Sequence, residues 1–264
     1  ELSSRVHPVF AVIFSSLLYL TIGPFFALPR TGAVSFEIGI LPFMSQDNAQ
    51  IGLLIFTILF FGLTLLLSLN PTKIVDNVGK YLSPGIIIGL FFLLIFVIIK
   101  PMGSFEAPQG NYVSNAFMTG FTEGYNTMDA LASLVFGIIV IQAIRSMGVT
   151  STKGILVATA KSGGIAILFL GLIYAGIAYL GATSVNEYGL FANGGPVLSA
   201  ASEHYFGSFG AILLSVIIFL ACLTTSIGLT TACGEYFHTL MPKISYKAFV
   251  IFFSIFTCII ANFG

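Results

Sequence analysis

Charged side chains are scarce in this sequence. Lys, Arg, Asp and Glu make up 8% of its 264 residues, whereas a soluble domain has about 25%. Hydrophobic residues make up 57%, and the mean hydropathy is +1.03. No soluble fold could bury this much Phe, Ile and Leu, so we predict an all-α polytopic membrane protein. Ten basic and ten acidic residues leave no formal net charge, which gives no indication of a nucleic-acid partner.

Motifs of enzyme chemistry are also missing. The sequence has no Gly-rich phosphate loop, no HExxH motif and no Cys/His cluster. Cys222, Cys233 and Cys258 lie in or beside apolar segments, without disulfide or metal-ligand spacing. We therefore expect no enzyme activity and no cofactor.

Neither end of the sequence looks like the end of a protein. Position 1 is Glu, no signal peptide precedes the first apolar run, and the last residues are still apolar. We expect a fragment of a longer chain that forms a single transmembrane domain over residues 1–264.

Seven apolar runs are long enough to cross about 30 Å of hydrocarbon, which takes roughly 17–25 helical residues. Because the runs are unbroken rather than alternating, we expect helices and not strands. The predicted spans are Pro8–Leu28, Ile51–Leu69, Pro84–Lys100, Tyr125–Arg145, Ile155–Gly181, Ser208–Thr230 and Tyr246–Phe263.

The basic residues predict an orientation in the membrane. With the N-terminus in the cytoplasm, eight Lys and Arg residues lie inside and only Arg30 and Lys100 lie outside, which the positive-inside rule favours. The connections 29–50, 101–124 and 182–207 are then external. In the last of them, Gly194-Gly195-Pro196 precedes a weak helical pattern from Val197 to Tyr205, which fits a lid and a solvated loop equally well.

The first span contains two prolines that interrupt its pattern. Pro24 lacks a backbone donor inside the apolar run, and Pro29 is expected to end the helix. Most prolines in membrane helices are packing kinks, so this interruption alone is a weak indication of a site.

The fourth predicted span carries the polar residue Asp129 near its start. A carboxylate at membrane depth costs about 2.5–3.5 kcal/mol on insertion scales, so it usually faces a cavity or a partner. Small residues beside it would let a ligand approach closely; these are Ala130, Ala132, Ser133 and Gly137. The alternative is that Asp129 lies near the outer headgroups and is simply hydrated. We interpret the stretch as an interrupted helix at a solute site, where Asp129 has a gating or coupling role.

A cluster of hydroxyl residues marks the sixth span. Thr224, Thr225 and Ser226 are consecutive near its middle, and neutral hydroxyl oxygens suit alkali cations. The alternative is that each hydroxyl bonds to a carbonyl one turn earlier, which is common in membrane helices. Because the hydroxyls form a cluster, a cation site is the favoured interpretation.

Two stretches resemble a known family. IGPFFALPRTGAVSFEIGI (Ile22–Ile40) and GYNTMDALASLVFG (Gly124–Gly137) are similar to signature stretches of the bacterial branched-chain amino acid:cation symporters. The resemblance covers essentially the whole chain. It implies import of leucine, isoleucine or valine with Na⁺, or H⁺ in some members, across the bacterial cell membrane. It also implies a protein of about twelve spans, of which this chain would supply spans three to nine.

The family is related to transporters with LeuT-like inverted repeats, and this relation implies roles for particular residues. Leu131–Gly137 would be the unwound part of a broken helix. The Ala221 carbonyl and the hydroxyls of Thr224 and Thr225 would bind Na⁺, with no other metal involved. Leu131 stands where a second Na⁺ site would need a threonine. The substrate would contact a set of small and aromatic residues: Phe25, Phe26, Ala130, Ala132, Ser133 and Phe136.

Two other classes of function remain open from the residues. A channel would need a continuous polar stripe, but the polar residues are concentrated in two spans. A structural subunit would need no hydroxyl cluster at the membrane midplane.

Residues 1–264 by themselves are expected to show no Na⁺-driven leucine uptake, because the early broken helix of the family lies outside them. Uptake of labelled leucine into proteoliposomes under an inward Na⁺ gradient checks this, with the complete protein as the positive control. Robust uptake by residues 1–264 would contradict the assignment of the missing helix.

Overall fold

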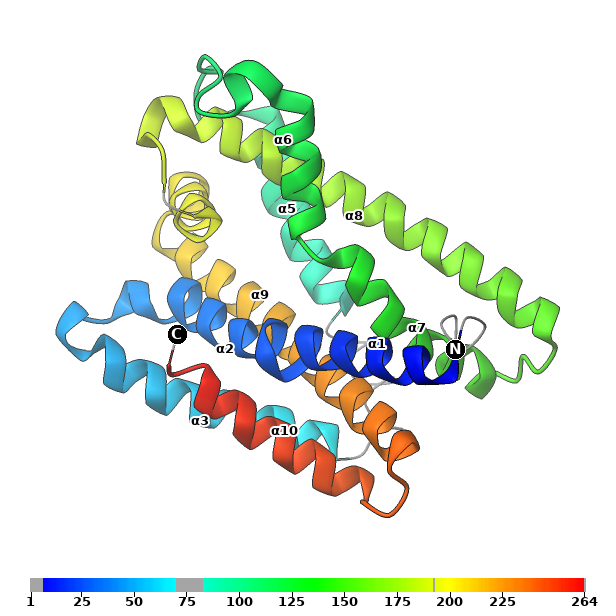
Figure 1. The fold of residues 1–264 in the computed structure, drawn as a ribbon. Coiled ribbons are helices and arrows are strands. Elements are labelled where there is room, and N and C mark those ends of the chain that lie inside the picture. The colour runs from blue at the N-terminus through cyan, green and yellow to red at the C-terminus, as the bar shows by residue number, and fades with distance from the viewer. Residues whose placement is uncertain (1–6, 70–82, 192, 264) are drawn as a thin grey trace. The chain divides into compact units, whose positions relative to one another are not determined.

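The computed structural model describes residues 7–69, 83–191 and 193–263, and every regular element in them is helical. The elements (Figure 1) are α1 (Pro8–Leu20), η2 (Thr21–Phe25), α2 (Ala27–Gly39), η3 (Leu41–Phe43), η4 (Gln46–Asn48), α3 (Ala49–Ser68), α5 (Ser83–Ile99), α6 (Tyr112–Asn126), α7 (Asp129–Ser146), α8 (Thr152–Tyr188), α9 (Gly194–Leu240) and α10 (Tyr246–Ile260).

Five helical stretches are long and apolar enough to cross a membrane, which confirms a multi-pass membrane protein. They are Pro8–Phe43, Ala49–Ser68, Tyr112–Ser146, Thr152–Tyr188 and Gly194–Leu240. Helices α5 and α10 are apolar but shorter, so the count of seven spans stays a prediction. The 37 residues of α8 extend over about 55 Å at the α-helical rise, well beyond the predicted span Ile155–Gly181.

The chain divides into two compact units. The first unit contains Glu1–Ile86 and Ser215–Gly264, and the second contains Ile87–Leu214. Helix α9 belongs to both, because the boundary falls between Leu214 and Ser215. The predicted single domain over residues 1–264 stays a prediction.

Two phenylalanines of α3 lie in the core of the first unit. Helix α10 packs along α3, and the two lie side by side in Figure 1. Phe60 and Phe61 of α3 are buried against Leu223 and Ile227 of α9 and against Ala261 at the end of α10. This cluster holds α9, with its threonine pair, between the other helices of the unit.

Side-chain hydrogen bonds link these helices inside the first unit. The Thr64 hydroxyl donates to Ser226 Oγ at 3.1 Å, and both side chains are buried. Asn262 Nδ2 donates to Thr57 Oγ1 at 2.8 Å, and the Tyr246 hydroxyl donates to a backbone carbonyl of α3 at 2.7 Å. Lipid tails are as apolar as leucine, so contacts between membrane helices are stabilised by close packing together with interhelical hydrogen bonds of this kind.

The predicted interruption at Pro24 is confirmed, whereas the predicted helix end at Pro29 is wrong. Residues Thr21–Phe25 form a π-helical turn in which Gly23 has non-helical angles (φ −81°, ψ −118°). The helix restarts at Ala27 and runs to Gly39. Pro29 thus lies in the first turn of α2, where a backbone N–H has no intrahelical acceptor and its loss costs little.

The hydrophobic core of the second unit lies where the C-terminal half of α5 packs against the C-terminal half of α8. Leu93 and Val97 of α5 are buried against Met102, Leu180 of α8 and Ala201 of α9. A serine cap begins α8, since Ser151 Oγ accepts from the Gly154 N–H at 3.1 Å. At the other end, Gly189 has φ 74°, a conformation that glycine adopts without strain.

The first segment of α9 is a packed helix and not a solvated loop. The helical pattern predicted from Val197 to Tyr205 is confirmed, and the helix breaks at Gly207 (φ 58°, ψ −148°). The ring of Phe206 lies 5.3 Å from Phe92 and 5.1 Å from Phe96 of α5 between centroids. The segment is therefore docked on α5 within the second unit.

A close backbone contact follows the Gly207 break. The buried Ser202 hydroxyl donates to the Gly210 carbonyl at 2.6 Å, and a Cβ at Gly210 would overlap the Ser202 carbonyl. Because the obstacle is backbone, it cannot rotate away as a flexible side chain would.

Substituting Gly210→Ala should therefore destabilise the second unit. Overpacking of this kind costs about 1–3 kcal/mol, seen as a lower Tm of the detergent-solubilised protein. Gly181→Ala in α8 is the matched control, because a Cβ there meets no atom within 4 Å. Equal melting temperatures for both variants would show that the contact at Gly210 is not tight.

Candidate functional site

The stretch around Asp129 is interrupted, but not where the sequence predicts. Helix α6 ends at Asn126 and α7 begins at Asp129. Between them, Met128 has φ 63°, the one positive φ of a non-glycine residue in the described ranges. A left-handed residue of this kind marks a functional or strained position.

The predicted unwound segment Leu131–Gly137 is helical, so that prediction is wrong. Helix α7 continues through it without a break from Asp129 to Ser146. Alanine and leucine are among the strongest helix formers, and they fill most of Asp129–Leu134. The Ser133 hydroxyl donates to the Ala130 carbonyl at 2.7 Å, which leaves the helix intact. The small side chains therefore let a neighbouring group approach one face of α7 closely, while the backbone of α7 stays helical.

Asp129 lies at the break and is held by two hydroxyl donors. Its Oδ2 accepts from the hydroxyl of Tyr174 on α8 and from Thr127 Oγ1 at 2.8 Å, and the single proton of Thr127 is shared with the Gly124 carbonyl at 2.7 Å. Asp129 is also in the first turn of α7, where the helix dipole favours a negative charge. The carboxylate therefore joins both sides of the break to α8.

Tyr174 is the site residue that sequence reasoning missed. It lies in α8 between Gly171 and Gly176, a small-residue region that by itself indicates only close packing. Its role depends on the bond to Asp129, which is 45 residues away in the sequence. A polar aromatic residue in the middle of a small-residue membrane helix was the available signal.

The predicted substrate-contacting residues of α7 differ in exposure. Ala130 and Ser133 are exposed, whereas Ala132 and Phe136 are half-buried. Residues four apart share a helix face, so Ala132 and Phe136 line one side of α7.

The predicted cation ligands lie within one turn of α9. The Ala221 carbonyl accepts from Thr224 Oγ1 at 2.9 Å and from Thr225 Oγ1 at 2.9 Å. Three neutral oxygens therefore converge in a small volume. The bonds also match the alternative, in which hydroxyls bond to the preceding turn. The two interpretations are compatible, because each hydroxyl that donates its proton keeps acceptor lone pairs.

The two predicted aromatic residues follow the Pro24 break and differ in their surroundings. The ring of Phe25 packs edge-on against Phe256 of α10, with centroids 5.7 Å apart. Phe26 is more exposed, at 60% against 48% for Phe25. Phe26 is therefore the better candidate for a pocket wall.

These predicted residues belong to both units. Asp129 and Ser133 are in the second unit, and Thr224, Thr225, Phe25 and Phe26 are in the first. The predicted meeting of Ser133 with Thr224 across a shared cavity stays a prediction.

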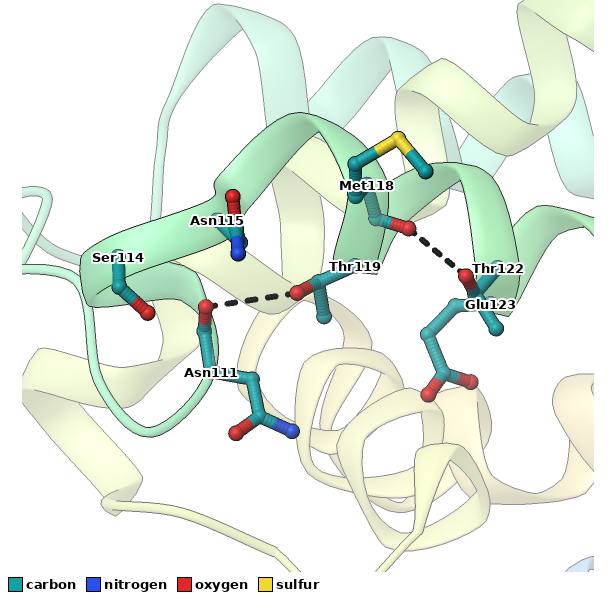
Figure 2. Close-up of a pocket in the computed structure, with 7 residues that line it drawn as sticks. All are labelled: Asn111, Ser114, Asn115, Met118, Thr119, Thr122 and Glu123. Atoms are coloured by element: carbon teal, nitrogen blue, oxygen red, sulfur yellow. Dashed lines mark hydrogen bonds between the residues drawn. The ribbon is translucent and has the colours of Figure 1, made fainter.

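A polar cavity along α6 was not predicted. Its volume is about 320 Å³, and Figure 2 shows the side chains that line it on one helix and its preceding turn. Asn115 has non-helical angles (φ −139°, ψ 50°), and Thr119 Oγ1 donates to the Asn111 carbonyl at 3.4 Å. Amide and hydroxyl side chains line it together with one carboxylate and one methionine, and it is open to the surface. The lining residues are Asn111, Ser114, Asn115, Met118, Thr119, Thr122 and Glu123.

The whole chain, residues 1–264, matches the protein family described as branched-chain amino acid transport protein. It is 51% identical, over its full length, to the branched-chain amino acid permease BrnQ of Bacillus subtilis and covers 60% of that protein. It is 50% identical to the permease BraB of the same organism, again over its full length and over 59% of that protein.

A third relative comes from Pseudomonas aeruginosa. The branched-chain amino acid transport system 2 carrier protein is 44% identical over 96% of this chain and 57% of its own length. The chain thus spans about 60% of the length of the curated relatives it matches. No solved structure matches it.

Removing the Tyr174 hydroxyl should loosen the α7–α8 contact at the break. Tyr174→Phe is expected to lower stability by about 0.5–1.5 kcal/mol, the net value of one hydrogen bond, measured as a shift in Tm. Tyr125→Phe, at an exposed ring, is the matched control. In an Asp129→Ala background the Tyr174→Phe change should cost nothing more, and an undiminished cost there would show that the bond to Asp129 does not stabilise the protein.

Proposed function

Because the chain belongs to the branched-chain amino acid transport protein family, we propose that the complete protein is a secondary active transporter that imports leucine, isoleucine or valine with Na⁺ or H⁺. The relatives are named as permeases or carriers of branched-chain amino acids. The observation that carries the proposal is the convergence of the Ala221 carbonyl with the hydroxyls of Thr224 and Thr225.

The cation binds at this turn of α9. Two hydroxyls placed three and four residues after a carbonyl lie over that carbonyl on one helix face. Thr224 is half-buried and Thr225 exposed, so this face is open on one side within the first unit. A hard cation needs more than three oxygens, and we assign the others to backbone carbonyls of a broken helix elsewhere in the complete protein.

The amino acid binds beside the start of α7. Its branched side chain contacts Ala130, Ala132 and Phe136. Phe25 and Phe26 stay candidates for further contacts of the substrate. Ser133 lies on the exposed part of α7. The substrate carboxylate is held by N–H groups at a half-helix N-terminus, the usual partner of an anion at membrane depth.

Asp129 couples binding to movement in this proposal. Its carboxylate holds the break at Met128 to α8 through Tyr174. A substrate ammonium or a proton that reaches the carboxylate competes with these two donors. Binding then changes how tightly the α6–α7 break is attached to α8.

The protein works by alternating access in the bacterial cell membrane, with the N-terminus of this chain in the cytoplasm and the lipid bilayer around its spans. The positive-inside count supports this orientation. The resemblance to transporters with LeuT-like inverted repeats supports this mechanism, because alternating access in such transporters is a movement of one repeat against the other.

Replacing both site threonines with alanine in the complete protein should weaken Na⁺ binding at least tenfold. We expect Thr224→Ala/Thr225→Ala to raise the Na⁺ concentration that half-activates uptake of labelled leucine. The matched control is Thr239→Ala, because Thr239 is exposed on the same helix and donates to the carbonyl four residues earlier at 2.8 Å. It removes a helix-bonding hydroxyl without touching the proposed site.

The comparison separates the two interpretations of the threonine pair. If both variants behave alike, the hydroxyls serve the helix only and the cation site is wrong. If uptake follows an imposed H⁺ gradient and ignores Na⁺, the coupling ion is H⁺. A protein that neither binds nor accumulates branched-chain amino acids under either gradient contradicts the proposed function.

A further inference from the structure

The second unit contains a long stretch of chain whose charged residues are all basic. No acidic residue occurs between Asp129 and Glu187, whereas Arg145, Lys153 and Lys161 lie in this stretch. Arg145 is in the last turn of α7, and Lys153 is in the first turn of α8. The two helices are joined by a short turn and pack against each other within the second unit (Figure 1). The three basic residues therefore belong to the same end of a helix hairpin.

The length of α8 places this end of the hairpin at a membrane surface. Its 37 residues extend over about 55 Å, whereas the hydrocarbon core is about 30 Å thick. At the C-terminal end, the Asn186 side chain bonds to Glu106 in the connection after α5, so the helix has left the hydrocarbon there. Counting about 30 Å back from Thr183 reaches Gly163, and a tilt of about 20° moves this boundary by roughly one residue. The part of α8 before Gly163, which includes Lys161, then lies beyond the hydrocarbon on the opposite side.

The face of α8 that carries the two lysines also carries apolar side chains. Residues three, four and eight positions after Lys153 share its helix face. They are Leu156, Val157 and Lys161, and all are exposed. Leu156 is 67% exposed, and Met147 in the turn between the two helices is 74% exposed. Exposed apolar groups beside basic ones suit the boundary between headgroups and acyl chains, where the apolar groups are buried and the charges reach the headgroups.

We propose that the basic surface formed by Arg145, Lys153 and Lys161 binds anionic phospholipid headgroups. Charge complementarity selects this partner, because Arg and Lys donate to phosphate oxygens and the stretch holds no carboxylate that would repel an anion. A zwitterionic headgroup carries a cation beside its phosphate, so it gains less from the same surface. In the proposed orientation this end of the hairpin is cytoplasmic, where anionic lipids attract basic residues next to a membrane span.

Bound headgroups hold the α7–α8 hairpin at a fixed depth in the bilayer. An α-helix longer than the hydrocarbon is thick can tilt or shift, and basic residues at one surface oppose both movements. The inference goes beyond the proposed transport function and does not depend on which solute is carried. The proposed orientation only names the leaflet, so lipid binding in detergent micelles tests the basic surface without it.

The test measures lipid binding by the complete protein after delipidation in a nonionic detergent. Phosphatidylglycerol and phosphatidylcholine with the same acyl chains are titrated separately, and bound lipid is counted by native mass spectrometry. We expect the wild type to bind phosphatidylglycerol at least tenfold more tightly, with a preference that falls as salt rises because ions screen exposed charges. Arg145→Gln/Lys153→Gln/Lys161→Gln should reduce the preference to less than threefold. All three side chains are exposed, so the Tm in detergent should stay unchanged.

Two controls separate the position of the charges from their number. Lys153→Arg/Lys161→Arg keeps both charges and should bind phosphatidylglycerol within twofold of the wild type. Lys161→Gln and Lys100→Gln each remove one exposed lysine from the second unit. Lys100 begins the connection that also contains Glu106, and its carbonyl accepts from the hydroxyl of Tyr205. We expect a two- to fourfold loss of affinity for Lys161→Gln and no measurable loss for Lys100→Gln.

Equal affinity of the wild type for the two lipids, or an unchanged preference in the triple variant, would overturn the inference. So would equal losses in Lys161→Gln and Lys100→Gln, since that pattern shows that any exposed lysine attracts the lipid. Transport is read separately, as uptake of labelled leucine by the wild type. A wild type that takes up no branched-chain amino acid, but loses its lipid preference in the triple variant, contradicts the proposed function and supports the basic surface.

Discussion

Hydrogen bonding in a medium that offers no water is the constraint on which this structure depends. Three of the helix breaks are accompanied by a nearby hydrogen bond. At Pro24 the Cys233 thiol reaches the preceding carbonyl. At Met128 the Asp129 carboxylate gathers the hydroxyls of Thr127 and Tyr174. After Gly207 a serine side chain bonds across the turn. These breaks are therefore stabilised by specific hydrogen bonds, and the residues beside them adopt backbone directions that a regular helix does not allow.

In the cation site that we propose, the same atoms of the α9 threonine pair would form a structural bond and bind the ion. Both hydroxyls bond to the Ala221 carbonyl, as they would in any membrane helix. The same bonds bring the two hydroxyl oxygens close to the Ala221 carbonyl and orient the remaining lone pairs of the hydroxyls. The buried Thr64–Ser226 bond beside the pair fixes the rotation of α9 against α3. A site of this kind needs no charged residue, which agrees with the low charge content of the chain.

Local patterns predicted much of this molecule because they depend on neighbours in sequence. The apolar runs, the interruption at Pro24 and the helix after Gly194-Gly195-Pro196 are set by hydropathy, by a missing donor and by turn residues. The bonds from Thr224 and Thr225 to the Ala221 carbonyl match the expected alternative, in which each hydroxyl bonds to a carbonyl one turn earlier, and the cation site stays a prediction. The predicted helix end at Pro29 was wrong, because a proline breaks a helix only in its interior and the helix restarts just before Pro29, at Ala27. The predicted unwinding of Leu131–Gly137 was wrong, because small side chains allow close approach to a helix without breaking its backbone hydrogen bonds.

The sequence by itself determined that this is a helical, multi-pass membrane protein whose helices are interrupted at Pro24 and near Asp129. Hydropathy and spacing are properties of neighbouring residues, so they can be read without a fold. Only the tertiary structure decided which partners those interruptions have: Tyr174 at Asp129, and Cys233 at the Gly23–Pro24 break. These pairs are separated by 45 residues or more, and no local rule selects one distant donor over another. Packing alone brings the donor to the break.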